Sequence, residues 1–263
     1  MAERASAVAE SIEQAAALLA RRPRCVALTG AGLSTRSGLP DFRSPGSGLW
    51  ALAERLPDDQ ARLMTLQGFK EAPEAFYARF RPFLAAVLSA APNPAHLALA
   101  QLEAAGYLQG VITQNGDGLH QKAGSQTVVE IHGSLATATC LRCYRSDAGP
   151  PLWQALCARG EAPRCRHCGG LMKPDVILTG EQLPWRAALK ARTLLRESAL
   201  ILIAGTSLPG GPVLAWLEAA CDRGARLAII NLGPTLLDPA AEVVVRADVV
   251  DALPAIAQRL RGT

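Results

Sequence analysis

Two pairs of cysteines carry the most specific chemistry in this sequence. "CLRC" (140–143) and "CRHC" (165–168) each hold two cysteines with two residues between them, and 21 residues separate the pairs. Each pair can close a small knuckle, and four thiolates satisfy tetrahedral zinc without leaving an open position. The pattern therefore predicts a structural zinc site, with free thiols or disulfides as the alternatives and His167 as a competing ligand. The predicted ligands are Cys140, Cys143, Cys165 and Cys168.

A polar loop follows the apolar run at 107–112. "TQNGDGLHQKAG" (113–124) places a Gln, an Asn, an Asp and a His within seven residues. A strand that ends in so many polar groups predicts a loop that binds a ligand. Gly116, in the middle of the loop, raises the question of how firmly that ligand is held.

A second candidate binding loop is "LTGAGLSTRSGLPDFRS" (28–44). Gly30 and Gly32 would let a backbone approach a pyrophosphate closely, with the following amides as donors. Thr35 stands where the third glycine of the ordinary dinucleotide fingerprint would be, so a tight turn is the alternative. Asp41, Phe42 and Arg43 then place two charges and an aromatic ring on the same loop.

Elements that could position these loops recur along the chain. Short apolar runs that predict buried strands occur at 24–30, 107–113, 127–133, 199–205, 225–231 and 242–248. Helical patterns, such as 93–106 and 211–224, lie between several of them. This alternation predicts an α/β fold: a Rossmann-like parallel sheet with helices on both faces. Ligands of such sheets bind beyond the carboxyl ends of the strands, where the polar and Gly-rich loops would converge.

Two stretches interrupt the alternation and predict a smaller zinc-binding and helical domain. We expect a Rossmann-like ligand-binding domain formed by 1–40, 89–136 and 176–263. A helical module that begins with part of the second binding loop would occupy 41–88, and a zinc-binding module 137–175.

Composition narrows the function class. Hydrophobic residues make up 49% of the 263, enough for a sizeable core, and the net charge of +4 comes without a Lys/Arg-rich run. We therefore expect no nucleic-acid partner and no membrane partner. Residues 1–24 lack a basic segment followed by an apolar core and read as an amphipathic helix, which favours a cytoplasmic protein with thiols or metal ligands rather than disulfides.

Four motifs and the cysteine quartet together resemble the sirtuin (Sir2) family. "GAGLSTRSGLPDFRS", "TQNGDGLHQKAGS", "EIHGS" and "GTSL" occur in that family's order and spacing, over roughly residues 24 to 254. The resemblance implies an NAD-dependent protein lysine deacylase (deacetylase) that binds NAD and zinc. Its partner would be an acylated protein or peptide lysine, and its products nicotinamide, free lysine and O-acyl-ADP-ribose.

The resemblance also implies a role for individual residues. His132, in the "HG" motif, matches the general base, a task that suits a neutral imidazole, and Asn115 matches a second catalytic residue. His96 and His120 are expected to be structural. The implied cofactor-binding residues are Gly30, Ala31, Gly32, Ser34, Asp41, Phe42, Arg43, Gln114, Asn115, Asp117, Gly205, Thr206, Ser207, Asn231 and Leu232, and the implied substrate-binding residues are Tyr77, Phe80, Val176, Thr179 and Gly180.

Two departures from the family pattern bear on the pocket. Gly116 stands where the family has a β-branched aliphatic residue, so we expect looser nicotinamide binding and a freer loop. Thr179 replaces the Phe of the family's Pro-x-Val-Val-x-Phe-Gly-Glu segment, which pairs with the substrate peptide as a β-strand.

The stretch "FYARFRPFL" (76–84) bears on acyl choice. Sirtuins that prefer succinyl and malonyl groups carry a Tyr and, three residues later, an Arg. Here Tyr77 fits the Tyr position, but Phe80 replaces the Arg. Arg79 and Arg81 are each rotated by about 100° from that direction on a helix, so we expect neutral acyl groups to be preferred. A core stripe is the alternative for Phe76, Phe80 and Phe83.

Two other functions remain open from the sequence. Mono-ADP-ribosyl transfer or NAD hydrolysis would use the same activated ribose with another nucleophile. A non-catalytic NAD sensor would be expected to lack the family's catalytic residues. The presence of His132 favours deacylation over both.

Overall fold

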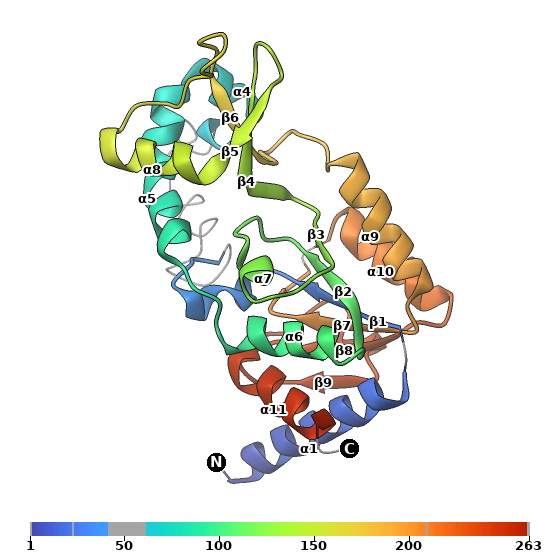
Figure 1. Ribbon diagram of the computed structural model, residues 1–263. Coiled ribbons are helices and arrows are strands. Elements are labelled where there is room, and N and C mark those ends of the chain that lie inside the picture. Colours follow the sequence, from blue (N-terminus) through green and yellow to red (C-terminus); the bar gives the residue numbers. More distant parts are fainter. Residues whose placement is uncertain (1, 23, 42–61, 209, 262–263) are drawn as a thin grey trace.

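Two sheets organise the chain in the computed structural model, which describes residues 2–22, 24–41, 62–208 and 210–261 (Figure 1). The larger sheet has six strands in the order β3-β2-β1-β7-β8-β9, and all neighbouring pairs are parallel. In chain order this is 3-2-1-4-5-6, the Rossmann arrangement, so the predicted fold class is confirmed. The strands are β1 (Cys25–Thr29), β2 (Leu108–Thr113), β3 (Val128–Glu130), β7 (Leu200–Ala204), β8 (Arg226–Ile230) and β9 (Val243–Val245).

These residues form central strands because both faces of the sheet are covered. Every residue of β1 and of β7 is buried, as expected for uninterrupted apolar runs in a parallel sheet. Cys25 and Ala27 enter the core on one face, and Val26 and Leu28 enter the core on the other. The strands lie inside the predicted runs but are shorter, β3 and β9 most of all.

Helices form a layer on each face of this sheet (Figure 1). On one side lie α1 (Ala2–Arg21), α6 (Pro94–Ala104) and α11 (Val249–Arg261), and on the other α9 (Trp185–Glu197) and α10 (Pro212–Asp222). The predicted N-terminal amphipathic helix is α1, which buries Ile12, Ala15 and Leu19. Short helices η1 (Ala31–Leu33), η2 (Thr35–Ser37), α7 (Leu119–Lys122) and η3 (Asp238–Ala240) lie in the connections.

The smaller lobe is built on an antiparallel sheet of order β5-β4-β6. Trp153, Phe69 and Phe76 belong to its single core, and the Trp153 Nε1 donates to Leu135 O at 2.7 Å. The predicted helical and zinc-binding modules therefore share one core. The elements are α4 (Leu66–Glu71), α5 (Pro73–Ser89), β4 (Gly133–Cys140), β5 (Ser146–Ala148), α8 (Gly149–Arg159) and β6 (Met172–Val176).

The predicted domain boundaries do not coincide with ends of elements. The boundary at 136/137 falls inside β4, and the one at 175/176 falls inside β6. Both strands extend from the small sheet to the edge of the large one, because β4 begins only three residues after β3 ends. The division into three modules remains a prediction.

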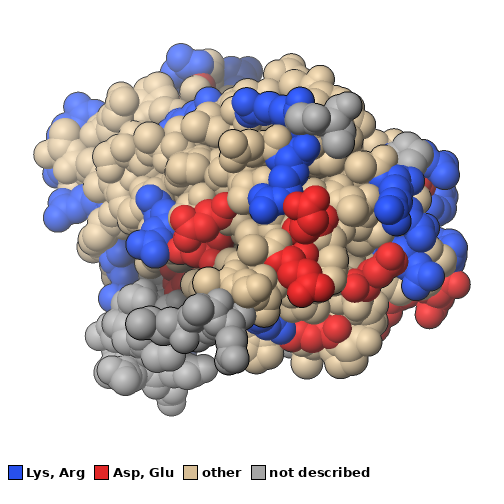
Figure 2. All heavy atoms as spheres, turned by 90° about the horizontal axis from the view of Figure 1, so that it is seen from below, with Lys and Arg blue, Asp and Glu red and all other residues tan. Residues whose placement is uncertain are grey.

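Charge on the surface is mixed. Figure 2 shows Lys and Arg side chains interspersed with Asp and Glu over the face that it presents. Among the described residues, no single helix has the length and apolar composition to cross a membrane. The bent pair α5 and α6, with 57° between them, meets that test only when the two are taken together.

Candidate functional site

A pocket of about 450 Å³ lies where the carboxyl ends of β1, β2 and β3 meet the smaller lobe. One part of its lining is polar and the other part is apolar. The sequence-predicted residues that line it are Ala31, Ser34, Phe80, Gln114, Asn115, Asp117, His132, Val176, Thr179 and Gly180. Sequence reasoning missed Leu39, Met64, Leu135, Ile177, Leu178, Glu181, Leu183 and Val213, which line the same pocket.

The loops after β1 and β7 pack directly on one another. A Cβ on Gly30 would lie 2.7 Å from Thr206 Cβ, and a Cβ on Gly32 would lie 2.8 Å from Gly205 O. Glycine is therefore required here by contact between the two loops, in addition to the predicted approach to a pyrophosphate. The Thr206 Oγ1 also donates to Gln114 Oε1 at 3.3 Å, which joins the β2 loop to the same contact.

Several predicted cofactor residues lie near the crevice without lining this pocket. Gly205, Thr206 and Ser207 follow β7, and Asn231 and Leu232 follow β8, so all lie at carboxyl ends of strands. Asn231 Nδ2 donates to Gly233 O at 2.9 Å, and Leu232 is exposed. Asp41 is half-buried, whereas Phe42 and Arg43 lie outside the described residues.

The polar floor of the pocket is a connected hydrogen-bond network. Asn115 Nδ2 donates to Gly30 O at 3.0 Å and to Ser34 Oγ at 3.1 Å. Ser34 Oγ in turn donates to Asp117 Oδ2 at 2.7 Å, and Asp117 Oδ1 accepts from Leu119 N at 2.9 Å. Asn115, Ser34 and Asp117 are each at most 9% exposed, so the network holds their orientation without competition from water.

Two buried histidines lie beneath this floor. His96 Nδ1 accepts from Asn93 N at 3.3 Å, so a neutral ring carries its proton on Nε2, which lies 3.5 Å from Ser34 Oγ. His120 Nε2 is 2.9 Å from Thr29 Oγ1, and the two imidazole rings are 5.0 Å apart. Burial lowers the pKa of His96 to about 4 and, together with the neighbouring His96, lowers the pKa of His120 to about 3.

His132 is positioned between the two sheets. It lies between β3 and β4, is half-buried, and has a pKa that burial lowers from its ordinary value. A hydrogen bond between its ring and the backbone oxygen of Gln114 opposes that shift. In the neutral ring one nitrogen donates in this bond, which leaves the other nitrogen as a proton acceptor.

The next residue, Gly133, occupies a position that only glycine can fill. Its φ is 77°, and a Cβ would lie 1.9 Å from Asp175 O. The backbone of β6 therefore passes directly against the residue that follows His132. His132 O also accepts from Ile177 N at 2.9 Å, so the histidine is tied to β6 and the segment after it.

The structure corrects the interpretation of Gly116. A Cβ there would lie 2.8 Å from Gly133 O and 3.0 Å from Val176 Cγ1, and Gly116 O accepts from Leu135 N at 2.9 Å. The loop is therefore held rather than freed. The space of a β-branched side chain is already filled by the His132–Gly133 turn and β6. Looser nicotinamide binding remains a prediction.

The apolar end of the pocket corrects the reading of Tyr77. Phe80 and Phe83 line the pocket, but Tyr77 does not. Its ring is fully buried against Phe69 and Phe76, and its hydroxyl donates to Met172 O at 2.5 Å. Tyr77 is thus a core residue of the smaller lobe. Among the described residues that line the pocket, none is a lysine or arginine.

Thr179 lies on the rim, but its backbone is already paired. Thr179 N donates to Met64 O at 3.2 Å, and Thr179 O accepts from Leu66 N at 3.1 Å. A peptide that pairs with this segment as a strand must therefore use backbone groups other than those of Thr179. Val176 and Gly180, on either side, line the pocket as expected from the sequence.

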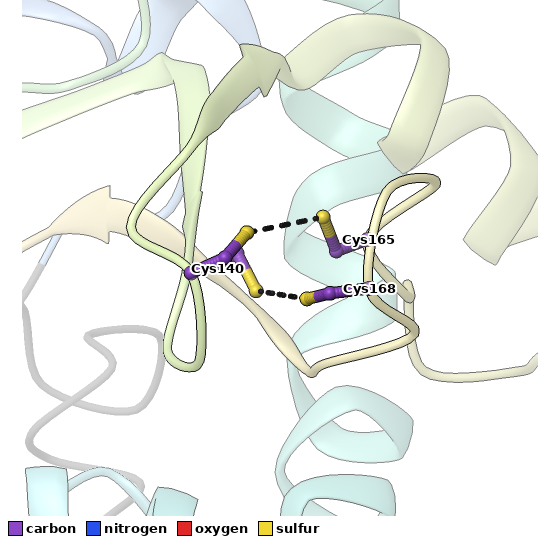
Figure 3. Close-up of side chains that lie close together, drawn as sticks. Cys140, Cys165 and Cys168 are labelled. Carbon is purple, nitrogen blue, oxygen red and sulfur yellow. Dashed lines mark hydrogen bonds between the residues drawn. The ribbon is translucent and has the colours of Figure 1, made fainter.

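The four predicted metal ligands meet at the far end of the smaller lobe (Figure 3). Their sulfur atoms all lie within 4.8 Å of one another, with Cys140 and Cys168 at 3.5 Å and Cys143 and Cys165 at 3.7 Å. A zinc–sulfur bond of about 2.3 Å implies tetrahedron edges of roughly 3.8 Å, so the cluster fits zinc.

The surroundings of the sulfurs also suit a metal. Backbone N–H groups lower the pKa of Cys140 and of Cys165, which favours the thiolates that zinc requires, whereas the neighbouring sulfurs raise the pKa of Cys168. A Cβ on Gly170 would lie 2.8 Å from Cys140 Sγ, so this glycine makes room for the knuckle. Cys140 and Gly133 lie opposite Met172 and Val176, which are four residues apart on β6, so the cluster is roughly 13 Å along the strands from the residue after His132. This separation makes the metal structural rather than catalytic.

The chain resembles known proteins over nearly its whole length. Residues 30–212 match the profile described as the Sir2 family. The chain is 41% identical over 254 residues to NAD-dependent protein deacetylase 1 of Pyrobaculum aerophilum, with 96% of each chain covered. It is 38% identical over 253 residues to NAD-dependent protein deacylase 2 of Archaeoglobus fulgidus, with 96% of this chain and 97% of that one covered.

Solved structures give the same result. A Sir2 enzyme from a study of the mechanism and regulation of these enzymes superposes with a TM-score of 0.86 at 37% identity, covering 96% of this chain and 98% of the other. A Sir2 complex with p53 peptide and NAD+ superposes with a TM-score of 0.82 at 33% identity, covering 94% and 97%.

Replacement of one metal ligand should remove the metal. We expect Cys165→Ala to lose zinc and to melt at a lower temperature, because metal binding is coupled to folding of the knuckle. Elemental analysis and thermal melting measure both effects, with Cys157→Ala, a half-buried thiol outside the cluster, as the control. Full zinc occupancy with unchanged melting would contradict the assignment.

Acid should destabilise the protein through its buried histidines. A histidine with a lowered pKa contributes its full stability above pH 6.5, and this contribution falls as the pH drops towards the folded-state value. Between pH 7 and pH 5, His120 alone should account for a loss of about 2 kcal/mol. Urea unfolding of the wild type and His120→Gln at both pH values measures this. Equal losses in wild type and His120→Gln would refute the assignment.

Proposed function

This chain belongs to the Sir2 family, and we propose that it is an NAD-dependent protein lysine deacylase whose general base is His132. One observation carries the proposal. A half-buried histidine with a lowered pKa shares one pocket with Asn115 and a largely apolar wall. A base, an oriented amide and an apolar enclosure are what deacylation of a lysine side chain requires.

The polar end of the pocket is proposed to bind NAD, and the apolar end to bind the acyl group. NAD, when bound, supplies the ribose carbon that the acyl oxygen attacks, so that nicotinamide leaves and the acyl group ends on ADP-ribose. His132 would take the proton of a ribose hydroxyl of bound NAD, through the ring nitrogen that is not bonded to Gln114 O, as that hydroxyl attacks the acyl carbon. Because its pKa is lowered, the ring is neutral and ready to accept that proton near neutral pH.

The polar floor is proposed to orient the nicotinamide half of NAD. The Asn115 amide is fixed by Gly30 O and Ser34 Oγ, and the Asp117 carboxylate is fixed by Ser34 Oγ and Leu119 N. Both N–H groups of Asn115 are used in these bonds, so Asn115 Oδ1 and the Asp117 carboxylate remain as acceptors for the two N–H donors of the nicotinamide carboxamide. The amides that follow Gly30 and Gly32 are proposed to bind the pyrophosphate, and the contact of these glycines with the β7 loop supports that role.

The substrate is proposed to be an acylated lysine of a protein or peptide. Related structures hold a p53 peptide together with NAD+ and, in another case, a propionylated peptide. In this chain the apolar lining formed by Phe80, Phe83 and Leu178 would receive the acyl group. The segment that carries Val176, Thr179 and Gly180 would contact the lysine and its backbone.

Product analysis tests the reaction class. With NAD and an acetylated peptide, mass spectrometry should find nicotinamide, free lysine and O-acetyl-ADP-ribose. A modified protein would instead indicate ADP-ribosyl transfer, free ADP-ribose would indicate NAD hydrolysis, and unchanged NAD would indicate a sensor. Each of those three outcomes contradicts the proposal.

The base can be tested by substitution. His132→Ala should lower kcat by roughly two to four powers of ten, because loss of a general base has that cost. NAD affinity should change little, since the polar floor does not include the imidazole ring. Steady-state kinetics and calorimetric NAD titration measure the two effects. A variant with near-normal turnover would place the base elsewhere.

Acyl choice can be tested with one peptide carrying different acyl groups. We expect kcat/KM for acetyl-, butyryl- or myristoyl-lysine to exceed that for succinyl-lysine by about tenfold or more. The reason is that an unpaired carboxylate would be buried against Phe80 and Phe83. Arg79→Ala and Arg81→Ala, both at exposed positions, should leave the ratio unchanged. If succinyl-lysine is the best substrate and either substitution abolishes this preference, that arginine binds the succinyl carboxylate and the prediction is wrong.

A further inference from the structure

A shielded lysine–glutamate pair lies next to the pocket, and the proposed chemistry does not use it. Lys173 Nζ and Glu181 Oε2 are 3.0 Å apart, and their side chains are only 11% and 20% exposed. Lys173 Nζ also donates to Pro174 O and to Val176 O, each at 2.9 Å. An ammonium group has three donors, so all three are satisfied by groups of one short stretch of chain.

Glu181 closes a turn with its other contacts. Its Oε2 accepts from Leu178 N at 2.7 Å, while its own backbone N donates to Leu178 O at 3.0 Å. Gly180, the third residue of this turn, has a φ of 91°, which is the position where a type II turn calls for glycine. The carboxylate therefore bonds to both the lysine and the first amide of the turn.

The stretch that this pair holds is one wall of the pocket. Residues 176–181, called the pocket wall below, all line the pocket. The wall is also bonded to His132 O through Ile177 N, and to the start of α4 through Thr179. The position of the pocket wall relative to the proposed base thus depends on Lys173 and Glu181, because these two side chains hold the wall against β6.

Stability alone does not account for the pair. Removing two charges from water costs free energy that their attraction often fails to recover, so a shielded ion pair is a poor source of stability. Its best-supported use is to select one conformation among several. A turn with a glycine in its centre has several conformations available, and a pair bonded to Val176 O and Leu178 N selects among them.

We infer that Lys173 and Glu181 are positioning residues that set the affinity for the acylated lysine by fixing the pocket wall. This inference rests on the proposed deacylase function. NAD affinity does not depend on the pair, because the polar floor is held by Ser34, Asn115 and Asp117, which belong to other elements.

Two substitutions separate this role from a general structural one. Lys173→Met removes the charge and keeps most of the side-chain volume, and Glu181→Gln keeps the shape and an acceptor for Leu178 N. Each should raise KM for an acetyl-lysine peptide by about tenfold or more, as expected for loss of a hydrogen bond to a charged group. KM for NAD and the zinc content should remain at wild-type values. Arg226→Met, which breaks the exposed pair with Glu242 on the large sheet, is the matched control and should change neither KM.

Peptide binding measured without turnover distinguishes the possible failures. Calorimetric titration of the full chain with the acetyl-lysine peptide should show the same loss of affinity in both variants, and Lys173→Arg should recover part of it. Wild-type peptide affinity in Glu181→Gln overturns the inference, whatever the outcome for Lys173→Met. A parallel rise in both KM values with a lower melting temperature also overturns it, since that result is what a purely structural role gives. A wild-type chain that binds the peptide but forms no deacylated product would refute the proposed function instead, and the binding arm would still decide the role of the pair.

Discussion

The passage of the chain from the large sheet to the small one, at His132 and Gly133, is the constraint on which the site depends. Gly133 is pressed against Asp175 O so closely that no side chain fits. The same approach fills the space beside Gly116 and brings Ile177 N to His132 O. The candidate base, the loop after β2 and the pocket wall are therefore three parts of one contact. Its tightness explains why the base is shielded enough to remain neutral.

Below that contact, polar groups are held in place by burial. Ser34 links Asn115, Asp117 and His96 through a single hydroxyl. In a medium of low dielectric each of these bonds is stronger than in water, and each unpaired group would be more costly. The shielding that fixes the floor also keeps His96 and His120 uncharged. Burial is thus the common cause of the fixed hydrogen bonds in the polar floor and of the expected loss of stability at acid pH.

Much of this could be predicted from the sequence because it depends on local patterns. Uninterrupted apolar runs such as β1 and β7 predict buried parallel strands, and the two cysteine pairs predict their cluster. Residues whose role depends on packing could not be placed this way. Tyr77 and Phe80 are neighbours in one helical stripe, and only the position of β6 decides that the first is core and the second lines the pocket. The crowding at Gly116 comes from residues 133 and 176, which no local pattern connects to it.

The antiparallel pair of β4 and β6 joins the metal cluster to the pocket. β4 runs from the base to Cys140, and β6 runs back from Met172 to the pocket wall, with Cys140 opposite Met172 and Gly133 opposite Val176. A slip of one residue between these strands would turn every side chain to the other face. A metal that locks the outer end of this strand pair therefore fixes, about 13 Å away, the alignment of the candidate base with the pocket wall. Oxidation of these thiolates would release the metal and disturb this alignment. The fit of the substrate would then be lost although the oxidant never enters the pocket.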